Sequence, residues 1–232
     1  MYKDRTGIIT LLALCSLFPV SAVFPSTSFA ATTTLNIPIK LTTHTADDFQ
    51  PSVSPDGKMV AFVSNRSGNN DIWLVPINGG PARQITFHTA SDSGPAWSRD
   101  GKRIAFASLR EDSKGDIWVL DLEGNIESRI TDSRGAESYP SWFPDGKRIA
   151  FSRGEGVWSI DLPTHKEERM FNGLYPSVSP DGKYIAFISL DDFPSPQSSP
   201  ARGEEAEKES LPSSGGKGSI YLYKTADNKI TR

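Results

Sequence analysis

An eight-residue motif occurs four times in this sequence, and no other feature constrains the fold as strongly. Each copy begins with proline and ends with Asp-Gly-Lys, and successive copies start 44, 45 and 36 residues apart. The copies are Pro51–Lys58, Pro95–Lys102, Pro140–Lys147 and Pro176–Lys183. A fixed period of this kind indicates repeated structural units that stack on one another, because one unit alone cannot bury its apolar face.

Each motif leads into short runs of β-branched and aromatic residues separated by turn formers. In the first unit these runs are Met59–Phe62, Asp71–Trp73 and a segment ending in Ile85–Thr86. Together with the motif they predict four short strands per unit. Four antiparallel strands in roughly 40 to 45 residues are typical of a β-propeller blade. The sequence therefore predicts an all-β fold of four four-stranded antiparallel blades, at about 43–86, 87–131, 132–171 and 172–232.

The Asp-Gly pair of each motif is interpreted as part of a turn that joins two strands. Proline presets φ at the second position of the turn, where the second copy has Arg99 instead, and glycine adopts the left-handed conformation that a side chain would resist. An aspartate in such a turn accepts hydrogen bonds from nearby backbone N–H groups, so a structural role is expected and not a catalytic one. The residues are Asp56, Gly57, Asp100, Gly101, Asp145, Gly146, Asp181 and Gly182.

The repeat resembles a known family. The pattern P-x-[WV]-S-P-D-G-K-x-[IV]-A-F, followed by D-I-W and then I-T, is similar to the WD40-like propeller repeat of TolB, a periplasmic component of the Tol-Pal system. The resemblance covers residues 36–232 and implies a propeller. It does not extend to the additional α/β domain of TolB, because only residues 31–36 separate the expected signal cleavage point from the first repeat-like strand. Similar repeats occur in propellers of prolyl-oligopeptidase-type peptidases and tricorn-like proteases, so the resemblance implies no single function.

The first thirty residues have the order of a secretory signal peptide. Lys3 and Arg5 precede an apolar run at 8–23 that is too short and too interrupted for a spanning helix. Small residues follow, and cleavage is expected after Ala30. We predict a signal peptide at 1–30, TolB-like repeats at 31–232 and a periplasmic location, with secretion as the alternative. Cys15 follows Leu14, not the Gly or Ala of a lipoprotein signal, so a lipid anchor is the minor alternative.

Composition and motifs exclude several classes of function. The 25 basic and 28 acidic residues provide no overall positive field for nucleic acid or anionic lipid. The single cysteine excludes an internal disulfide framework, and the sequence has neither a Gly-x-Ser-x-Gly elbow nor a Gly-Lys-Ser/Thr phosphate loop. His44, His88 and His165 do not form a metal motif. We expect no catalytic residue, cofactor or metal, no nucleic acid partner, and no stable membrane span after signal cleavage.

The loops opposite the Asp-Gly turns vary in length and charge, which is typical of recognition on a rigid repeat scaffold. One set of these loops comprises residues 45–50, 89–94, 132–139 and 172–175, and the other comprises 65–70, 110–115 and 153–156. We predict that a protein or peptide partner binds to this face. The candidate residues are Asp47, Asp48, Arg66, Asp92, Arg110, Glu111, Asp112, Glu137 and Arg153.

Two features of the ends bear on closure of the propeller. Residues 191–218 are rich in proline, serine and charge, and predict a mobile surface insertion, with a partner-binding or protease-sensitive arm as the alternative.

Residues 35–42 match the outer strand of a blade, yet the fourth unit already supplies its own outer strand at 227–232. The leading strand is then left without a partner blade. We expect an incomplete, open propeller of a six- to eight-bladed family, or self-association through its open ends.

Two functions from different classes follow from these patterns. The first is an exported, non-enzymatic propeller that serves as a protein- or peptide-binding scaffold in the cell envelope. The alternative is the N-terminal propeller portion of a prolyl-oligopeptidase-type or related hydrolase whose catalytic domain is not in this chain. A truncated gene product without function is a third, weaker hypothesis.

Overall fold

The structure is a computed structural model that describes residues 38–189, 218–226 and 229–231. The predicted signal peptide lies outside these residues, and so does the predicted insertion apart from its last residue. Residues 39–232 belong to one compact unit. Over the described ranges, no helix has the length and apolar character needed to cross a membrane.

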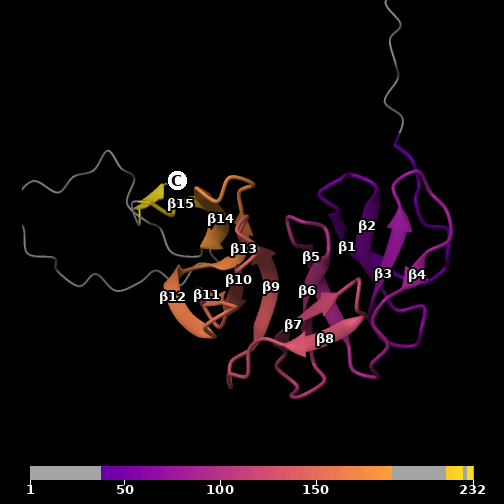
Figure 1. Cartoon of the computed structure of the whole chain (residues 1–232), viewed down its shortest axis with the longest axis horizontal. Coiled ribbons are helices and arrows are strands. Elements are labelled where there is room, and N and C mark those ends of the chain that lie inside the picture. Colours follow the sequence, from indigo (N-terminus) through magenta and orange to yellow (C-terminus); the bar gives the residue numbers. More distant parts are fainter. Residues whose placement is uncertain (1–37, 190–217, 227–228, 232) are drawn as a thin grey trace, which may run out of the picture. The chain divides into compact units, whose positions relative to one another are not determined.

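The described residues form four antiparallel sheets of four strands, and each sheet is one blade (Figure 1). Blade 1 contains β1 (Asp48–Val53), β2 (Met59–Ser64), β3 (Asp71–Pro76) and β4 (Arg83–Gln84). Blade 2 contains β5 (Asp92–Trp97), β6 (Arg103–Ser108), β7 (Asp116–Asp121) and β8 (Ile126–Arg129). Blade 3 contains β9 (Glu137–Trp142), β10 (Arg148–Arg153), β11 (Gly156–Asp161) and β12 (Lys166–Asn172). Blade 4 contains β13 (Leu174–Val178), β14 (Tyr184–Ser189), β15 (Ser219–Lys224) and β16 (Lys229–Thr231). The all-β prediction of four four-stranded antiparallel blades is confirmed.

The repeated motif forms the last three residues of the first strand of each blade and the turn that follows it. In blade 1, the N–H of Gly57 donates to the carbonyl of Ser54 at 2.9 Å, and Gly57 has φ of +70°. The carboxylate of Asp56 accepts from the hydroxyl of Ser54 at 2.7 Å and from the N–H of Lys58 at 3.1 Å. The other three turn glycines also have positive φ, between +65° and +70°. Glycine is favoured at these positions because it adopts positive φ without a steric penalty.

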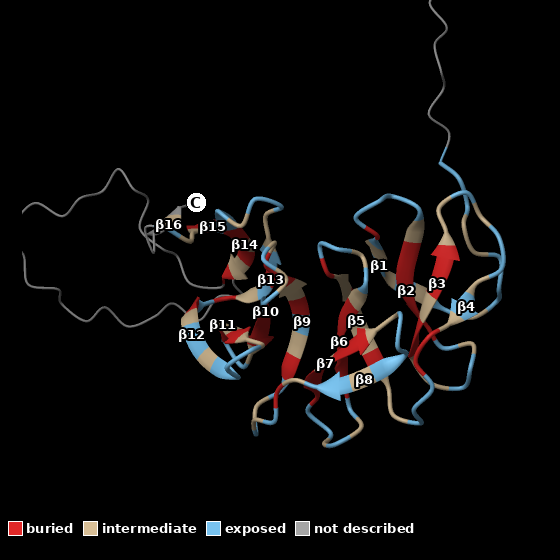
Figure 2. Cartoon of the chain, in the orientation of Figure 1, coloured by how far each residue is buried: buried red, intermediate tan, exposed pale blue. Residues whose placement is uncertain are grey.

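The core lies between consecutive blades, and it explains why β2, β6 and β10 are almost wholly buried (Figure 2). One face of blade 1, which includes Val63 and Ile72, packs against Ile104, Phe106 and Leu120 of blade 2. Equivalent clusters join blade 2 to blade 3 and blade 3 to blade 4. The outer strands β4 and β8 have no buried residue, since they cover the edge of each blade and face solvent.

The two ends of the row of blades differ. Leu41 packs on Val60, Phe62 and Val75 of blade 1, but residues 38–47 form no strand. The prediction of an outer strand at 35–42 is therefore wrong over its described part: Leu41 contacts blade 1 through its side chain, but residues 38–42 make no backbone pairing with any strand in the described part of the chain, and a strand needs such pairing. At the other end, Ile220 of β15 is 71% exposed, although the equivalent Ile117 of β7 is fully buried against blade 3.

Candidate functional site

Six of the nine predicted binding residues come together as three ion pairs, one in each of the first three blades. Each acid begins the innermost strand, and each arginine lies at the end of the second strand or just after it. The shortest distances between the paired atoms are 2.7, 3.2 and 2.6 Å in blades 1, 2 and 3. The pairs are Asp48 with Arg66, Asp92 with Arg110, and Glu137 with Arg153. The fold thus brings these charges together within blades, even though Arg153 follows Phe151 by two residues whereas Arg66 and Arg110 follow the equivalent Phe62 and Phe106 by four.

The three arginines also lie on aromatic rings of their own blades. The guanidinium carbon of Arg110 is 4.4 Å from the centre of the Trp118 ring and 5.5 Å from that of Phe106. Arg66 and Arg153 make the same contacts with the equivalent rings. Guanidinium groups stack well on aromatic faces, so the tryptophan of the Asp-Ile-Trp segment is a platform for a cation as well as a core residue. Sequence reasoning missed this role of the tryptophan. A signal was present, because blades 1 to 3 have the acid, the arginine and the tryptophan, whereas blade 4 has none of the three.

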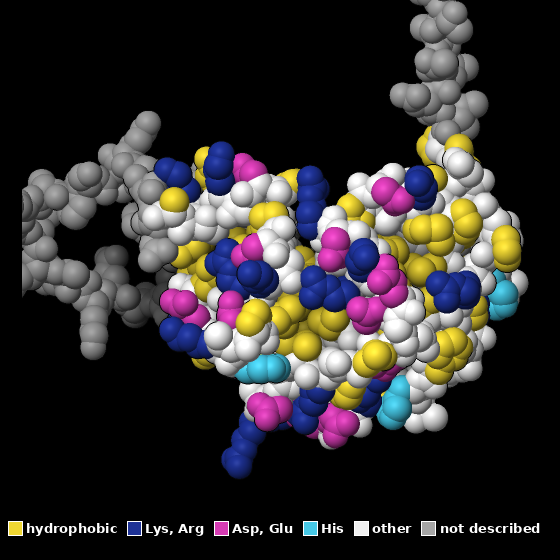
Figure 3. Space-filling view, viewed as in Figure 1, with side chains coloured by type: hydrophobic (Ala, Val, Ile, Leu, Met, Phe, Trp, Pro, Cys, Tyr) yellow, Lys and Arg dark blue, Asp and Glu magenta, His cyan; other side chains and the backbone are white. Residues whose placement is uncertain are grey.

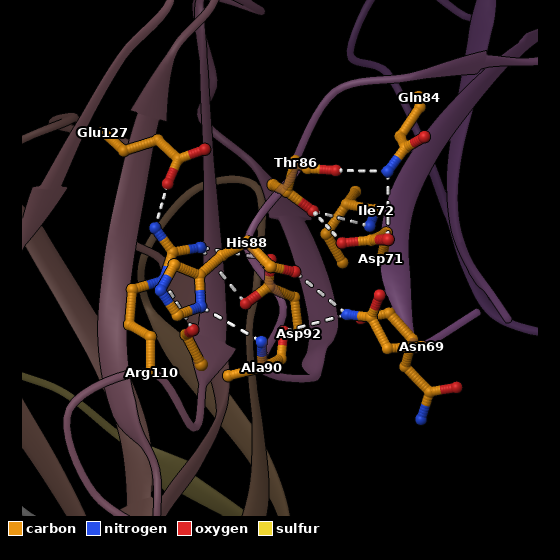
Figure 4. A network of polar contacts seen from close by, with 12 residues as sticks. Asn69, Asp71, Ile72, Gln84, Thr86, His88, Ala90, Asp92, Arg110 and Glu127 are labelled. Carbon is orange, nitrogen blue, oxygen red and sulfur yellow. Dashed lines mark hydrogen bonds and ion pairs between the residues drawn. The ribbon is translucent and has the colours of Figure 1, made fainter. Parts of the chain in front are cut away.

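The pair in blade 2 belongs to a network that ties it to blade 1 (Figure 4). Arg110 contacts Glu127 as well as Asp92, and Asp92 is fully buried. Burial raises the pKa of Asp92, against the opposing effects of Ser108, Thr86 and Arg110. Thr86 in turn accepts a hydrogen bond at 2.9 Å from the N–H of Ile72 in blade 1.

A second branch of this network fixes the loop between the two blades. The side-chain amide of Asn69 donates to the carbonyls of His88 and Ala90, both at 3.0 Å. The ring Nδ1 of His88 accepts from the N–H of Ala90 at 3.0 Å, and His44 makes the same bond with Ala46. These two histidines therefore shape equivalent turns. In the part of the chain that the structure describes, no group of three or more His, Cys, Asp or Glu side chains could hold a metal ion.

The remaining three predicted residues are neighbours of the paired residues in the sequence but take no part in the three ion pairs. Asp47 is exposed and exchanges hydrogen bonds with Asn65, and Glu111 is exposed in the loop of blade 2. Asp112 accepts from the N–H groups of Lys114 and Gly115, which lower its pKa. Charged side chains of both signs lie beside one another over the face shown in Figure 3, with no field of one sign. A partner can therefore reach these three charges, whereas the three ion pairs are largely enclosed.

All four blades contribute to a pocket of about 190 Å³ beside their innermost strands. At the same position in each blade, one residue has a positive φ, and a proline follows it. These residues are Gln50, Gly94, Tyr139 and Tyr175, with φ of 50°, 61°, 53° and 56°. We call this pocket, with the four prolines, the axial mouth. The strand register shifts here in every blade, which identifies the positions as β-bulges that redirect side chains.

The polar groups of the axial mouth are held in place by contacts between blades. The N–H of Gly94 donates to the side-chain oxygen of Gln50 at 2.8 Å. The rings of Tyr139 and Tyr175 meet edge to face with their centres 4.3 Å apart, and these residues are 37% and 43% exposed. Burial, followed by the proximity of Tyr175, raises the pKa of Tyr139. Aromatic faces, phenol groups and a side-chain amide suit binding of a polypeptide more than acid–base chemistry.

The axial mouth was not among the predicted site residues. Gln50, Gly94, Tyr139 and Tyr175 are the last residues of the four predicted loops, directly before the prolines of the motif. A non-glycine residue with positive φ is uncommon and costs energy, so three of them at equivalent places indicate a constrained site. The sequence contains no clear sign of this conformation, because glutamine and tyrosine do not favour it.

Two family models match parts of this chain. Residues 29–115 match the Tricorn protease N-terminal beta propeller domain, and residues 89–197 match the TolB beta propeller domain. No curated protein matches the chain.

Solved structures of low sequence identity share the fold. A putative TolB from Agrobacterium tumefaciens is 23% identical with a TM-score of 0.64, over 82% of this chain and 66% of the relative. TolB from Acinetobacter baumannii is 21% identical with a TM-score of 0.65, over 82% of this chain and 44% of the relative. The propeller domain of the Trilobed protease from Pyrococcus furiosus, described as having an open velcro topology, is 22% identical with a TM-score of 0.51, over 80% and 56%. The chain thus spans less than two thirds of these relatives, and its four blades correspond to part of a larger propeller.

Proposed function

Because the chain is built from TolB-like β-propeller repeats, as predicted, we propose that it is an exported, non-enzymatic scaffold that binds a protein or peptide in the cell envelope. The axial mouth is the observation that carries this proposal. It combines two partly exposed tyrosines, a glutamine and four prolines from all four blades in one pocket. Tyrosine is enriched where interfaces have most of their binding energy, because its ring buries a large area and its hydroxyl donates a hydrogen bond.

The loops around the axial mouth supply the variable part of the proposed surface. Asp47, Glu111 and Asp112 contribute negative charge to the loops of the predicted binding face, Lys114 and Arg134 contribute positive charge, and the buried ion pairs hold these loops in position. These loops carry charges of both signs, so they favour a partner segment with a complementary arrangement of charges, which affects the rate of association more than the final affinity. Recognition in this proposal combines a tyrosine-lined centre with charged loops of variable sequence.

Replacement of the two tyrosines tests the proposal. We expect the Tyr139→Ser and Tyr175→Ser double variant to lose at least tenfold in the amount of envelope protein that co-purifies with it. Tyr184→Ser is the matched control, because Tyr184 is similarly exposed at 39% but lies next to an Asp-Gly turn. Equal recovery of partners by the double variant and the control would contradict a binding role of the axial mouth.

Export is tested separately from binding. The signal peptide prediction requires that the protein isolated from the cell begins at Ala31, which mass spectrometry of the intact protein measures directly. A protein that retains residues 1–30 and stays in the cytoplasm would overturn the envelope location without affecting the binding site.

A hydrolase-associated propeller is the second candidate. It is favoured by the match of residues 29–115 to a tricorn protease propeller and by the likeness to the propeller domain of the Trilobed protease. In that case the chain would control access to a catalytic domain. The DNA directly downstream of the codon for Arg232 separates the two candidates: a Gly-x-Ser-x-Gly elbow with later Asp and His residues in the same reading frame would establish the hydrolase.

A further inference from the structure

A pocket of about 570 Å³ lies between blades 1 and 2, beside their Asp-Gly turns. Its wall includes Met59, Leu122 and the partly buried ring of Trp97, and its rim includes Asp56 and Gly101. The axial mouth has an entirely different lining, so the two pockets are distinct. We call this second pocket the turn pocket.

The equivalent space between blades 2 and 3 is filled by an arginine of the chain itself. The guanidinium carbon of Arg103 lies 4.6 Å from the centre of the Trp142 ring. One of its nitrogens donates to the carbonyl of Gly146 at 2.9 Å and lies 3.6 Å from the carboxylate of Asp100. Trp142 is only 7% exposed. The second junction thus shows how this site holds a guanidinium group.

The turn pocket has the same parts except for a cation at the repeat position of Arg103. Trp97 occupies the position of Trp142, and their indole N–H groups make the same bond to the preceding blade, at 3.0 Å to Ser52 and 3.1 Å to Ala96. Asp56 and Gly101 occupy the positions of Asp100 and Gly146 in the repeat. The position of Arg103 is taken by Met59, an uncharged residue.

The carboxylate of Asp56 is suited to pairing with an incoming cation. One of its oxygens accepts hydrogen bonds from the Ser54 hydroxyl and the Lys58 N–H, and these bonds hold its pKa below the ordinary value. The other oxygen lies 3.6 Å from the ammonium of Lys58, with both side chains more than half exposed, so this pair is weak. Arg99 also lines this pocket, and its positive charge opposes the binding of a second cation. The attraction of Asp56 alone is therefore not enough, and stacking of the cation on the Trp97 ring must contribute to binding.

We propose that the turn pocket binds the guanidinium group of an arginine side chain from a partner polypeptide. The guanidinium stacks on Trp97, pairs with Asp56 and donates to the carbonyl of Gly101, as Arg103 does within the chain at the next junction. A planar guanidinium fits this arrangement better than the compact ammonium of lysine. The site lies apart from the axial mouth, so it goes beyond the proposed function and does not depend on it.

NMR spectroscopy of the ¹⁵N-labelled protein tests this site directly, with N-acetylarginine amide as the probe. Each of the five tryptophans of the chain contributes one indole N–H signal, and single Trp→Phe variants assign these signals. We expect the probe to shift the Trp97 signal in a saturable manner and to leave the Trp142 signal in place. N-acetylcitrulline amide, which has a neutral side chain of the same shape, should leave both signals unchanged. An unmoved Trp97 signal would overturn the proposal, and an equal shift with N-acetyllysine amide would overturn the guanidinium assignment.

Two reciprocal variants complete the test, since the repeat supplies its own control. Met59→Arg puts a guanidinium group of the chain itself into the turn pocket, as Arg103 does at the next junction, and should therefore abolish the shift of the Trp97 signal by the probe. Arg103→Met empties the equivalent space and should add a saturable shift of Trp142. An unchanged Trp158 signal in Met59→Arg and an unchanged Trp73 signal in Arg103→Met report that each variant has kept its fold, because each of these rings packs in a different cluster from the substituted site. Undiminished binding by the folded Met59→Arg variant would contradict the proposed position of the ligand.

Discussion

Arg110 illustrates how single residues hold this fold together. It pairs with Asp92 and Glu127 and lies on the ring of Trp118, with only 7% of its side chain exposed. Its partner Asp92 is fully buried and would lose its counter-charge if the arginine were removed. A residue that pattern reasoning assigns to a binding loop is therefore a structural anchor whose removal affects the whole molecule.

Arg110→Met should lower the free energy of unfolding by about 3 to 5 kcal/mol, because it leaves a buried carboxylate without its partner. Urea denaturation at neutral pH measures this change. Glu111→Gln is the neighbouring control, and we expect it to change the free energy of unfolding by no more than about 0.5 kcal/mol, since its side chain is exposed. The same stability for both variants would show that the ion pair does not anchor the blade.

The turn aspartates make stability depend on pH. Hydrogen bonds from Ser179 and the N–H of Lys183 hold the pKa of Asp181 below its ordinary value. Such a carboxylate stabilises the folded state above its unfolded pKa, and this contribution is lost as the pH falls through the folded pKa. Burial raises the pKa values of Asp92 and Asp116, which has the opposite sign and weakens the folded state as the pH rises.

We therefore expect the free energy of unfolding to fall as the pH drops below about 4, and to fall less steeply in Asp181→Asn. Urea midpoints measured at a series of pH values between neutral and acid provide the comparison. If the variant and the wild type have parallel profiles, the turn hydrogen bonds do not contribute in the way described.

At the level of elements, each blade is stabilised by the blade beside it. Ile117 of β7 and Ile220 of β15 occupy the same register position, opposite Ala107 and Ile188 respectively. Ile117 is buried between blades 2 and 3, whereas Ile220 is 71% exposed on the outer face of blade 4. The same residue type in the same strand position therefore has two different environments.

Ile117→Ala should cost about 2 to 5 kcal/mol of unfolding free energy, because it opens a cavity between two blades. Ile220→Ala should cost less than about 0.5 kcal/mol, because the side chain already contacts solvent. Chemical denaturation of both variants gives the comparison. A similar loss in both would mean that the outer face of blade 4 is covered in solution.

At the level of the whole molecule, the repeat explains which features could be predicted. Strands, turns and blades were predictable because strand alternation and Asp-Gly turns are local signals that occur four times. The leading strand was not, since a strand forms only where another strand pairs with it, and residues 38–47 pair with none of the described strands. The paired roles of Asp92 and Arg110 depend on contacts between residues 18 positions apart. The axial mouth depends on the positive φ of Gln50, Tyr139 and Tyr175, which those residue types do not indicate.

Site-specific photocrosslinking tests the central claim, that this propeller binds a polypeptide at its axial mouth. A photoreactive phenylalanine analogue at Tyr175, introduced in cells that contain the native envelope, is expected to form a discrete adduct with one protein. The same analogue at Tyr184, which is similarly exposed but lies next to an Asp-Gly turn, is expected to form none with that protein. No adduct at Tyr175, or the same adduct at both positions, would contradict the account.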